Sequence, residues 1–198
     1  MSQLVDRSIR REQERSSEIP KDPKSAAWPP GPSLVKPKPM IRPWCPNQLQ
    51  PASYDVRLGR EVRTENGLTF DMDGTLKQYA LPPGGFVLGH TEEYFRLPAH
   101  LCARVDGKSS VGRRGLAVHV TAGFIDPGFN GQITLELKNH SQVHCFILVP
   151  GMMIAQVTFH RLTDVPERLY GDERLGSHYQ NQTGATPAFQ PAAPQRSE

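Results

Sequence analysis

Residues 107–137, in the central part of the chain, read GKSSVGRRGLAVHVTAGFIDPGFNGQITLEL. The first part of this stretch combines glycine and serine with the cations Lys108 and Arg113. Hydroxyls, backbone N–H groups and a guanidinium fork are groups that hold phosphate oxygens. Such a run also occurs in ordinary surface turns, so its meaning depends on what surrounds it.

The second part of this stretch has a strand–turn–strand pattern, because residues 127–131 supply proline, glycine and asparagine for a turn. Antiparallel pairing about this turn places Glu136 opposite Thr121–Ala122. By the two-residue period of a strand, Glu136 shares a face with Thr134, whereas its apolar neighbour Leu135 points the other way. A single glutamate in a strand often only faces solvent, and that reading stays open at this point.

Short apolar runs broken by glycine and proline continue on both sides of the stretch. They are residues 54–58, 85–88, 146–149 and 153–159. No amphipathic segment of helical length separates them, a pattern typical of an all-β barrel or jelly roll. We expect one short helix near 108–116, capped by Ser109 or Ser110, and another over 4–11 with Asp6 as its N-cap.

The length of 198 residues predicts one domain with tails. Nine of the nineteen prolines fall in residues 1–46, so 17–46 is expected to be extended and PPII-like. The expected division is a leader (1–46) with its short helix, a folded β domain (47–166) and a C-terminal tail (167–198). The tail is expected to fray from Thr186 onward.

Charge, cysteine content and the distribution of apolar residues argue against several classes of protein. Residues 1–50 hold nine basic and five acidic residues (+4), which leaves −1 for residues 51–198 out of the total of +3. A nucleic-acid-binding domain would carry its positive charge on the folded part, so no nucleic acid is expected as a partner. Three widely spaced cysteines favour a reducing, cytoplasmic setting. No apolar stretch is long enough to span a membrane, and the charged residues 1–15 do not resemble a secretory signal.

The central stretch closely resembles the dCTP deaminase family, a branch of the trimeric dUTPase-like fold. Further matches flank it in order: residues 50–59, 86–93, 150–156, and 170–171 leading to 178–184. The resemblance covers about residues 48–186, and residues 4–11 look like the opening segment of the family. It implies a dUTPase-like distorted jelly roll or β-barrel with one or two short helices, and a C-terminal tail that covers the nucleotide.

The resemblance implies an enzyme that deaminates dCTP, releasing ammonia and a deoxyuridine nucleotide for dTMP synthesis. Zinc deaminases need an H-x-E and a P-C-x-x-C motif. His90-Thr91-Glu92 supplies the first, but the chain has no P-C-x-x-C, so zinc is not expected. A protein base must then activate water, and by the family pattern Glu136 takes a proton from the water that attacks C4 of cytosine.

The family pattern also implies roles for further residues. Ser109 and the carbonyl of Ala122 hold the water, and Arg113 stabilises developing charge. Asp126 contacts the 3′-hydroxyl of the deoxyribose. The residues implied in nucleotide binding are Lys108, Ser109, Ser110, Val111, Gly112, Arg113, Asp126, Thr134, Leu135, Glu136, Gln156, Tyr170, His178 and Gln182. His178 stands where the family usually has a lysine, so a weaker grip on phosphate is expected there.

Some family members stop at dUTP and others continue to dUMP and diphosphate. Ala122-Gly123 and Gln156 resemble the bifunctional members. A small residue at 123 leaves room for a second water near the α-phosphorus, with Asp126 positioned to orient it. Mg²⁺ held through the triphosphate oxygens, and not by a protein metal site, would neutralise the leaving diphosphate. Alternatively, Gly123 only relieves a tight strand end.

The alternatives are a monofunctional deaminase that releases dUTP, a plain dUTPase, and a non-catalytic trimeric nucleotide-binding regulator. A dUTPase usually ends in a glycine-rich tail with an arginine, which Gly171–Gly184 does not resemble. The resemblance further implies a homotrimer with active sites between subunits and dTTP as a feedback inhibitor.

Overall fold

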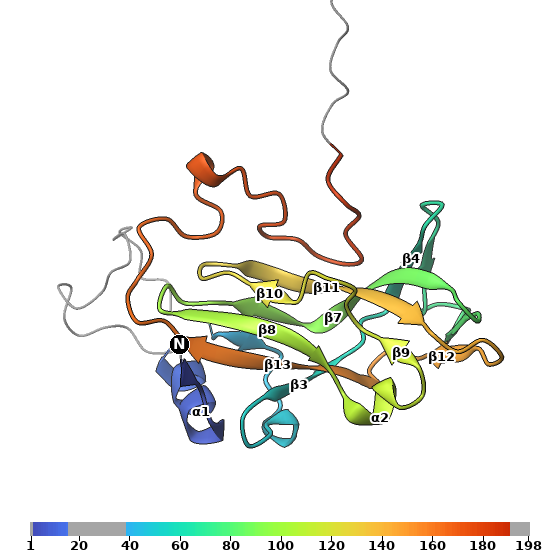
Figure 1. Ribbon diagram of the computed structural model, residues 1–198, viewed down its shortest axis with the longest axis horizontal. Coiled ribbons are helices and arrows are strands. Elements are labelled where there is room, and N and C mark those ends of the chain that lie inside the picture. The colour runs from blue at the N-terminus through green and yellow to red at the C-terminus, as the bar shows by residue number, and fades with distance from the viewer. Residues whose placement is uncertain (1, 16–38, 191–198) are drawn as a thin grey trace, which may run out of the picture.

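The computed structural model describes residues 2–15 and 39–190, which form two antiparallel β-sheets packed face to face with the C-terminal segment crossing one side (Figure 1). In the first sheet the order is β1-β13-β8-β10, with β3 also pairing with β13. Its strands are β1 (Ser2–Gln3), β3 (Tyr54–Arg57), β8 (Leu101–Gly107), β10 (Phe124–Ile125) and β13 (Met153–Arg161).

The second sheet has the order β5-β4-β7-β11-β9, with β2 also pairing with β7. Its strands are β2 (Ile41–Arg42), β4 (Glu61–Thr64), β5 (Thr69–Asp71), β7 (Phe86–Arg96), β9 (Leu116–Ala117) and β11 (Asn130–Asn139). A separate ribbon joins β6 (Tyr79–Leu81) to β12 (Phe146–Leu148). The helices are α1 (Asp6–Arg15) and α2 (Ser109–Gly112), with 3₁₀ turns at Pro46–Gln48 and Glu173–Leu175.

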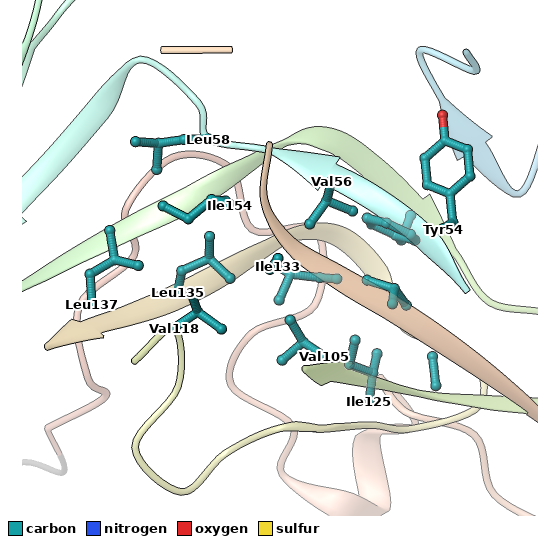
Figure 2. Packing of buried hydrophobic residues seen from close by; sticks show 14 of the residues in the cluster. Tyr54, Val56, Leu58, Val105, Val118, Ile125, Ile133, Leu135, Leu137 and Ile154 are labelled. Carbon is teal, nitrogen blue, oxygen red and sulfur yellow. The ribbon is translucent and has the colours of Figure 1, made fainter. Parts of the chain in front are cut away.

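One hydrophobic core fills the space between the sheets. Figure 2 shows Val56 and Val105 from the first sheet on either side of Ile133 from the second. Along β11 buried side chains alternate with partly exposed ones, as the period of two predicts. Full burial of a side chain such as Leu135 stabilises the fold by about 1.5–3 kcal/mol. The alternation therefore fixes which face of β11 is left for a site.

The predicted strand runs are confirmed, as is the all-β jelly-roll-like class, although the hydrogen-bonded sheets of the described residues stay open and form no closed barrel. The helix expected over 108–116 is shorter. Its N-cap is Lys108 and not a serine, and the Lys108 side chain makes no capping hydrogen bond. The helix expected over 4–11 begins at Asp6 and continues to Arg15. β8 follows no pattern that we identified in the sequence.

The predicted hairpin about residues 128–129 is wrong. β10 pairs with β8, whereas β11 pairs with β7 and β9. The reason lies in the turn, where the N–H of Gly128 donates to the carbonyl of Leu97 and the N–H of Leu97 donates to that of Phe129. These bonds tie the turn to the end of β7, so the chain passes from one sheet to the other and does not fold back on itself.

Helix α1 is attached to the β domain by buried polar groups. The Gln13 amide hydrogen-bonds both the N–H and the carbonyl of Ile41, at 2.8 and 2.9 Å.

Most of the predicted extended leader, residues 16–38, lies outside the described residues, and the division of the chain at 46 and 166 stays a prediction. No helix in the described ranges is both long enough and apolar enough to cross a membrane.

Candidate active site

A cavity of about 410 Å³ lies against the outer face of β11 and under the C-terminal tail. Its walls come from β7, residues 119–126, Phe129, β11 and the tail. The predicted site residues that line it are Ala122, Asp126, Thr134, Glu136, Tyr170 and Gln182. Sequence reasoning therefore identified residues from three separated segments that the fold brings to one cavity.

Glu136 is held in a fixed position at this cavity. It lies on β11 opposite Leu88 of β7. Its Oε2 accepts hydrogen bonds from the backbone N–H of Val120 at 2.6 Å and of Thr121 at 3.2 Å. The predicted proximity of Glu136 to residues 121–122 is thus correct, but it results from the hydrogen bonds of the carboxylate and not from pairing between two strands. Among the described residues Oε1 has no hydrogen-bond partner, so one carboxylate oxygen is available to a substrate or water.

Two polar atoms at the cavity are buried and have no partner among the described residues: Thr134 Oγ1 and His119 Nδ1. Buried polar atoms in native proteins are nearly always hydrogen-bonded, so both atoms indicate that a ligand or water binds here. Sequence reasoning missed His119. Its only signal in the sequence was its position between the glycine- and serine-rich run at 107–113 and Asp126, and for a single histidine such a position is weak evidence of a site.

Gly123 lies against the His119 ring. A Cβ at position 123 would come within 3.1 Å of the Val105 carbonyl oxygen and 3.2 Å of His119 Cε1. The close approach gives Gly123 a packing role, in line with the alternative reading that it relieves a tight strand end. A larger residue at 123 would displace His119 from the cavity wall.

Asp126 follows β10 and begins the turn to β11. Burial raises the pKa of its carboxyl group. The ring of Tyr170 packs against Phe129 with ring centroids 5.9 Å apart, and its hydroxyl accepts a hydrogen bond from Tyr179 N at 3.1 Å. Asp126 and Tyr170 therefore meet at the wall where the tail crosses the turn.

The C-terminal tail, residues 167–190 of the described chain, closes the cavity from above β10 and β11 (Figure 1). The Gln182 amide donates to the carbonyl of Gln132 at 2.7 Å. The predicted fraying from Thr186 is wrong for 186–190, because Thr186 lines the cavity and Phe189 N donates to the Tyr179 hydroxyl at 3.0 Å. Residues 191–198 lie outside the described residues.

His178 does not line the cavity. Its ring stacks on Phe189, with centroids 3.8 Å apart and planes 5° from parallel. The side chain of Leu135 is fully buried in the core on the other face of β11, as the strand period predicted, so its implied role in nucleotide binding does not fall to its side chain. The stacking of His178 on Phe189, in contrast, is a contact that the sequence pattern does not show.

The predicted phosphate-binding residues of 108–113 do not line this cavity. Helix α2, which they form, lies at the bottom of Figure 1, whereas the tail lies at the top. Lys108 Nζ pairs with Asp55 Oδ2 at 2.5 Å, and Val111 is buried in the core. Gln156 lies near this cluster, since its amide donates to the carbonyl of Gly107 at 3.1 Å. One chain therefore carries two separate clusters, one with Glu136 and one with Arg113.

A second opening lies beside Glu136, on the side away from the tail. This cavity of about 630 Å³ is lined by His119, Val120, Thr121 and Glu136, among others. Val120 there is 57% exposed. The carboxylate of Glu136 thus stands between the tail-covered cavity and an open surface.

Comparison with known proteins places the chain in a family. A family profile described as dCTP deaminase-like matches residues 34–162. A protein of Bifidobacterium adolescentis named "dCTP deaminase, dUMP-forming" is 46% identical over 163 residues, which cover 75% of this chain and 84% of the relative. The chain belongs to the dCTP deaminase family. The same name is carried by a protein of Corynebacterium glutamicum strain R, 44% identical over 75% of this chain and 86% of the relative.

A solved structure supports the fold of this dCTP deaminase family member. The crystal structure of 2′-deoxycytidine 5′-triphosphate deaminase from Agrobacterium tumefaciens superposes with a TM-score of 0.57 at 19% identity. The match covers 80% of this chain, and the chain spans 48% of the length of that structure. Family membership confirms the resemblance that the motifs indicated.

Proposed function

We propose that this protein hydrolyses dCTP to dUMP, diphosphate and ammonia, using two molecules of water. The observation that carries the proposal is the fixed carboxylate of Glu136 beside the unpartnered Thr134 Oγ1, in one cavity under the tail. Relatives 44–46% identical carry the name "dCTP deaminase, dUMP-forming", which supports both steps.

Glu136 is proposed as the general base of the deamination. Val120 and Thr121 hold Oε2, so Oε1 is the atom that takes a proton from a water at the cavity. The resulting hydroxide attacks C4 of cytosine, and Glu136 gives the proton it took to N3. Glu136 then takes the proton of the new C4 hydroxyl and passes it to the amino group, so that the C4–N bond breaks, the C4 carbonyl forms and ammonia leaves. The carbonyl of Ala122, which lines the same cavity, is proposed to orient the water.

The second step is hydrolysis at the α-phosphorus. Asp126 is proposed to orient the second water, because it lines the cavity and lies at the turn beneath the tail. Among residues 2–15 and 39–190, no three His, Cys, Asp or Glu side chains are grouped to hold a metal ion. Mg²⁺ is proposed to enter with the triphosphate, where it would neutralise the charge of the leaving diphosphate.

A second copy of the chain is proposed to complete the site. Ser109 and Arg113 lie in a different cluster from Glu136, although the chemistry needs a phosphate grip and a cation near the base pocket. The open cavity beside Glu136, with Val120 exposed, offers the place where the 108–113 segment of a neighbour would approach. We propose a homotrimer, in keeping with the three-fold assemblies that the resemblance implies.

Two further expectations stay proposals. dTTP is proposed as a feedback inhibitor, since it shares the triphosphate and the deoxyribose of the substrate. A cytoplasmic location is proposed because the substrate and product are nucleotides of DNA precursor synthesis. The first rests on the resemblance, and the second also on the three widely spaced cysteines.

A product assay tests the proposal. The protein is incubated with Mg²⁺ and dCTP or, in a parallel reaction, dUTP. Ammonia, dUTP, dUMP and diphosphate are measured over time, and binding of dCTP is measured by calorimetry. The expected result from dCTP is ammonia, dUMP and diphosphate in equal amounts. Accumulation of dUTP would show a monofunctional deaminase. Hydrolysis of dUTP without release of ammonia from dCTP would show a dUTPase, and binding without any product would show a regulator.

A further inference from the structure

Residues 182–186 of the tail separate two cavities on the same side of the second sheet. Gln182 and Thr186 line the 410 Å³ cavity that contains Glu136. Thr183 and Gly184 line another cavity, of about 550 Å³, together with Glu61 and His90. This short segment therefore forms part of the wall of both cavities.

Besides the hydrogen bonds between Gln182 and Gln132, the segment is attached at two consecutive backbone amides. Glu61 Oε1 accepts a hydrogen bond from the N–H of Ala185 at 2.9 Å, and Gln132 Oε1 accepts one from the N–H of Gly184 at 2.8 Å. Ala185 itself is only 3% exposed. Hydrogen bonds with an ionised acceptor are roughly twice as strong as neutral ones, so Glu61 is the stronger of the two attachments.

The backbone of the tail is shaped for this contact. Gly184 has a φ of +71°, and a Cβ there would lie 2.9 Å from Glu61 Oε1. Any other residue at 184 would adopt a strained conformation and collide with the carboxylate. The tail thus carries a glycine at the point where Glu61 approaches it.

His90 fixes the backbone of Glu61. The N–H of Glu61 donates to His90 Nε2 at 3.3 Å, while His90 Nδ1 lies 2.9 Å from the carbonyl oxygen of Thr91. These partners require Nδ1 to carry the proton and Nε2 to accept, which is the neutral imidazole. Gly59 makes room for the ring, because a Cβ there would lie 2.0 Å from His90 Cε1. The start of β4, and with it Glu61, is therefore held rigidly.

We propose that Glu61 is a positioning residue that holds the tail closed over the nucleotide cavity. It does not line that cavity, so it acts through Ala185 and the adjoining Thr186 and makes no contact with the substrate. The inference rests on the proposed function, in which this cavity binds the nucleotide. A closed tail is the binding-competent state, and loss of the attachment lowers its population and raises the apparent dissociation constant in proportion.

The test compares three variants. Glu61→Ala removes the acceptor, whereas Glu61→Gln keeps an amide oxygen in the same place. Asp73→Ala is the matched control, because Asp73 lines the same 550 Å³ cavity but pairs with Arg60 and not with the tail. Hydrogen–deuterium exchange without nucleotide follows a peptide over 182–190, with a peptide over 101–107 of β8 as the internal reference.

Glu61→Ala is expected to speed exchange at 182–190 and leave 101–107 unchanged. Glu61→Gln, which keeps an acceptor without the charge, is expected to lie between Glu61→Ala and the parent protein, and Asp73→Ala is expected to stay close to the parent. In dCTP kinetics Glu61→Ala is expected to raise KM roughly tenfold, equivalent to about 1.4 kcal/mol, with kcat within about twofold. Unchanged exchange at 182–190, or equally faster exchange at 101–107, would overturn the proposal. So would faster exchange at 182–190 with KM unchanged.

The exchange experiment needs no catalytic activity. If the parent protein released no ammonia from dCTP, the proposed function would fail, while exchange would still show whether Glu61 holds the tail. If the parent protein were active and Glu61→Ala exchanged like it, only the role of Glu61 would fail.

Discussion

Glu136 and Val120 are joined by a hydrogen bond of 2.6 Å between a carboxylate oxygen and a backbone N–H, across 16 residues of sequence. The bond fixes one oxygen of Glu136 and leaves the other at the cavity. It also ties the segment that carries Ala122 to the strand that carries Glu136. The base and the carbonyl proposed to orient its water are therefore positioned by the same contact.

Replacement of Glu136 by glutamine tests its role as the base. Glu136→Gln retains the size of the side chain but cannot accept the proton, so ammonia release is expected to fall by at least about 10³-fold. Binding of dCTP, measured by calorimetry, is expected to stay within about threefold of the parent. Glu65→Gln, an acid at the same open cavity, serves as control and is expected to be active. Substantial ammonia release by Glu136→Gln would show that the base is misassigned.

Asp126 is expected to act in the second step. In Asp126→Asn the carboxylate that orients the second water is lost, so conversion of dUTP to dUMP is expected to slow by about 10²-fold. Ammonia release is expected to continue, and dUTP should appear as a product. Chromatography of the nucleotides over time measures both steps in one reaction. Equal loss of both steps would instead assign Asp126 to binding of the sugar alone.

Mixed trimers test whether two chains form one site. Glu136→Gln and Arg113→Ala are each expected to be inactive. If a site takes Glu136 from one chain and Arg113 from its neighbour, random mixing leaves about one quarter of the sites with both native residues. Co-expressed chains with separate affinity tags are purified as mixed assemblies and assayed for ammonia. If the mixed assemblies are no more active than Glu136→Gln or Arg113→Ala alone, the whole site lies within one chain.

The attachment of α1 is expected to weaken in acid. Burial alone would raise the pKa of Glu12, but hydrogen bonds from His100 and Arg161, at 3.2 and 2.6 Å, outweigh it and lower the pKa to about 2. Because the pKa of Glu12 is lower in the folded state than its ordinary value of 4.5, the ionised carboxylate stabilises the fold at pH values above 4.5. This stabilisation is lost as the pH falls from about 4.5 to 2.

Glu12→Gln measures that contribution. Its free energy of unfolding in urea is expected to be about 2–3 kcal/mol lower than that of the parent at pH 7, with the difference shrinking at pH 3. Gln13, the next residue, contacts Ile41 and has no ionisable group, so Gln13→Ala should give a difference that does not depend on pH in this way. A pH-independent effect of Glu12→Gln would contradict the account.

The sequence predicted those features that depend on local pattern. Alternation predicted that Glu136 and Thr134 share one face of β11, and turn residues predicted the bend after Asp126. The nearness of Glu136 to Ala122 was predicted correctly from an incorrect hairpin, because the two segments are close for another reason. The carboxylate bridges them, and the strands belong to different sheets.

Contacts between distant segments could not be predicted in the same way. The separation of the 108–113 segment from Glu136 follows from how β8 and β13 pair, which no local pattern specifies. The bond between Glu61 and Ala185 joins residues 124 positions apart through a side chain and a backbone N–H. Such a contact leaves no periodic signal in the sequence, so only the folded structure reveals it.

A competition experiment tests whether this protein carries dCTP through deamination to dUMP. Labelled dCTP and Mg²⁺ are supplied together with an excess of unlabelled dUTP. Ammonia and labelled dUMP are expected in equal amounts, with no label in the dUTP pool. Label accumulating in dUTP, or no release of ammonia, would contradict the proposed function.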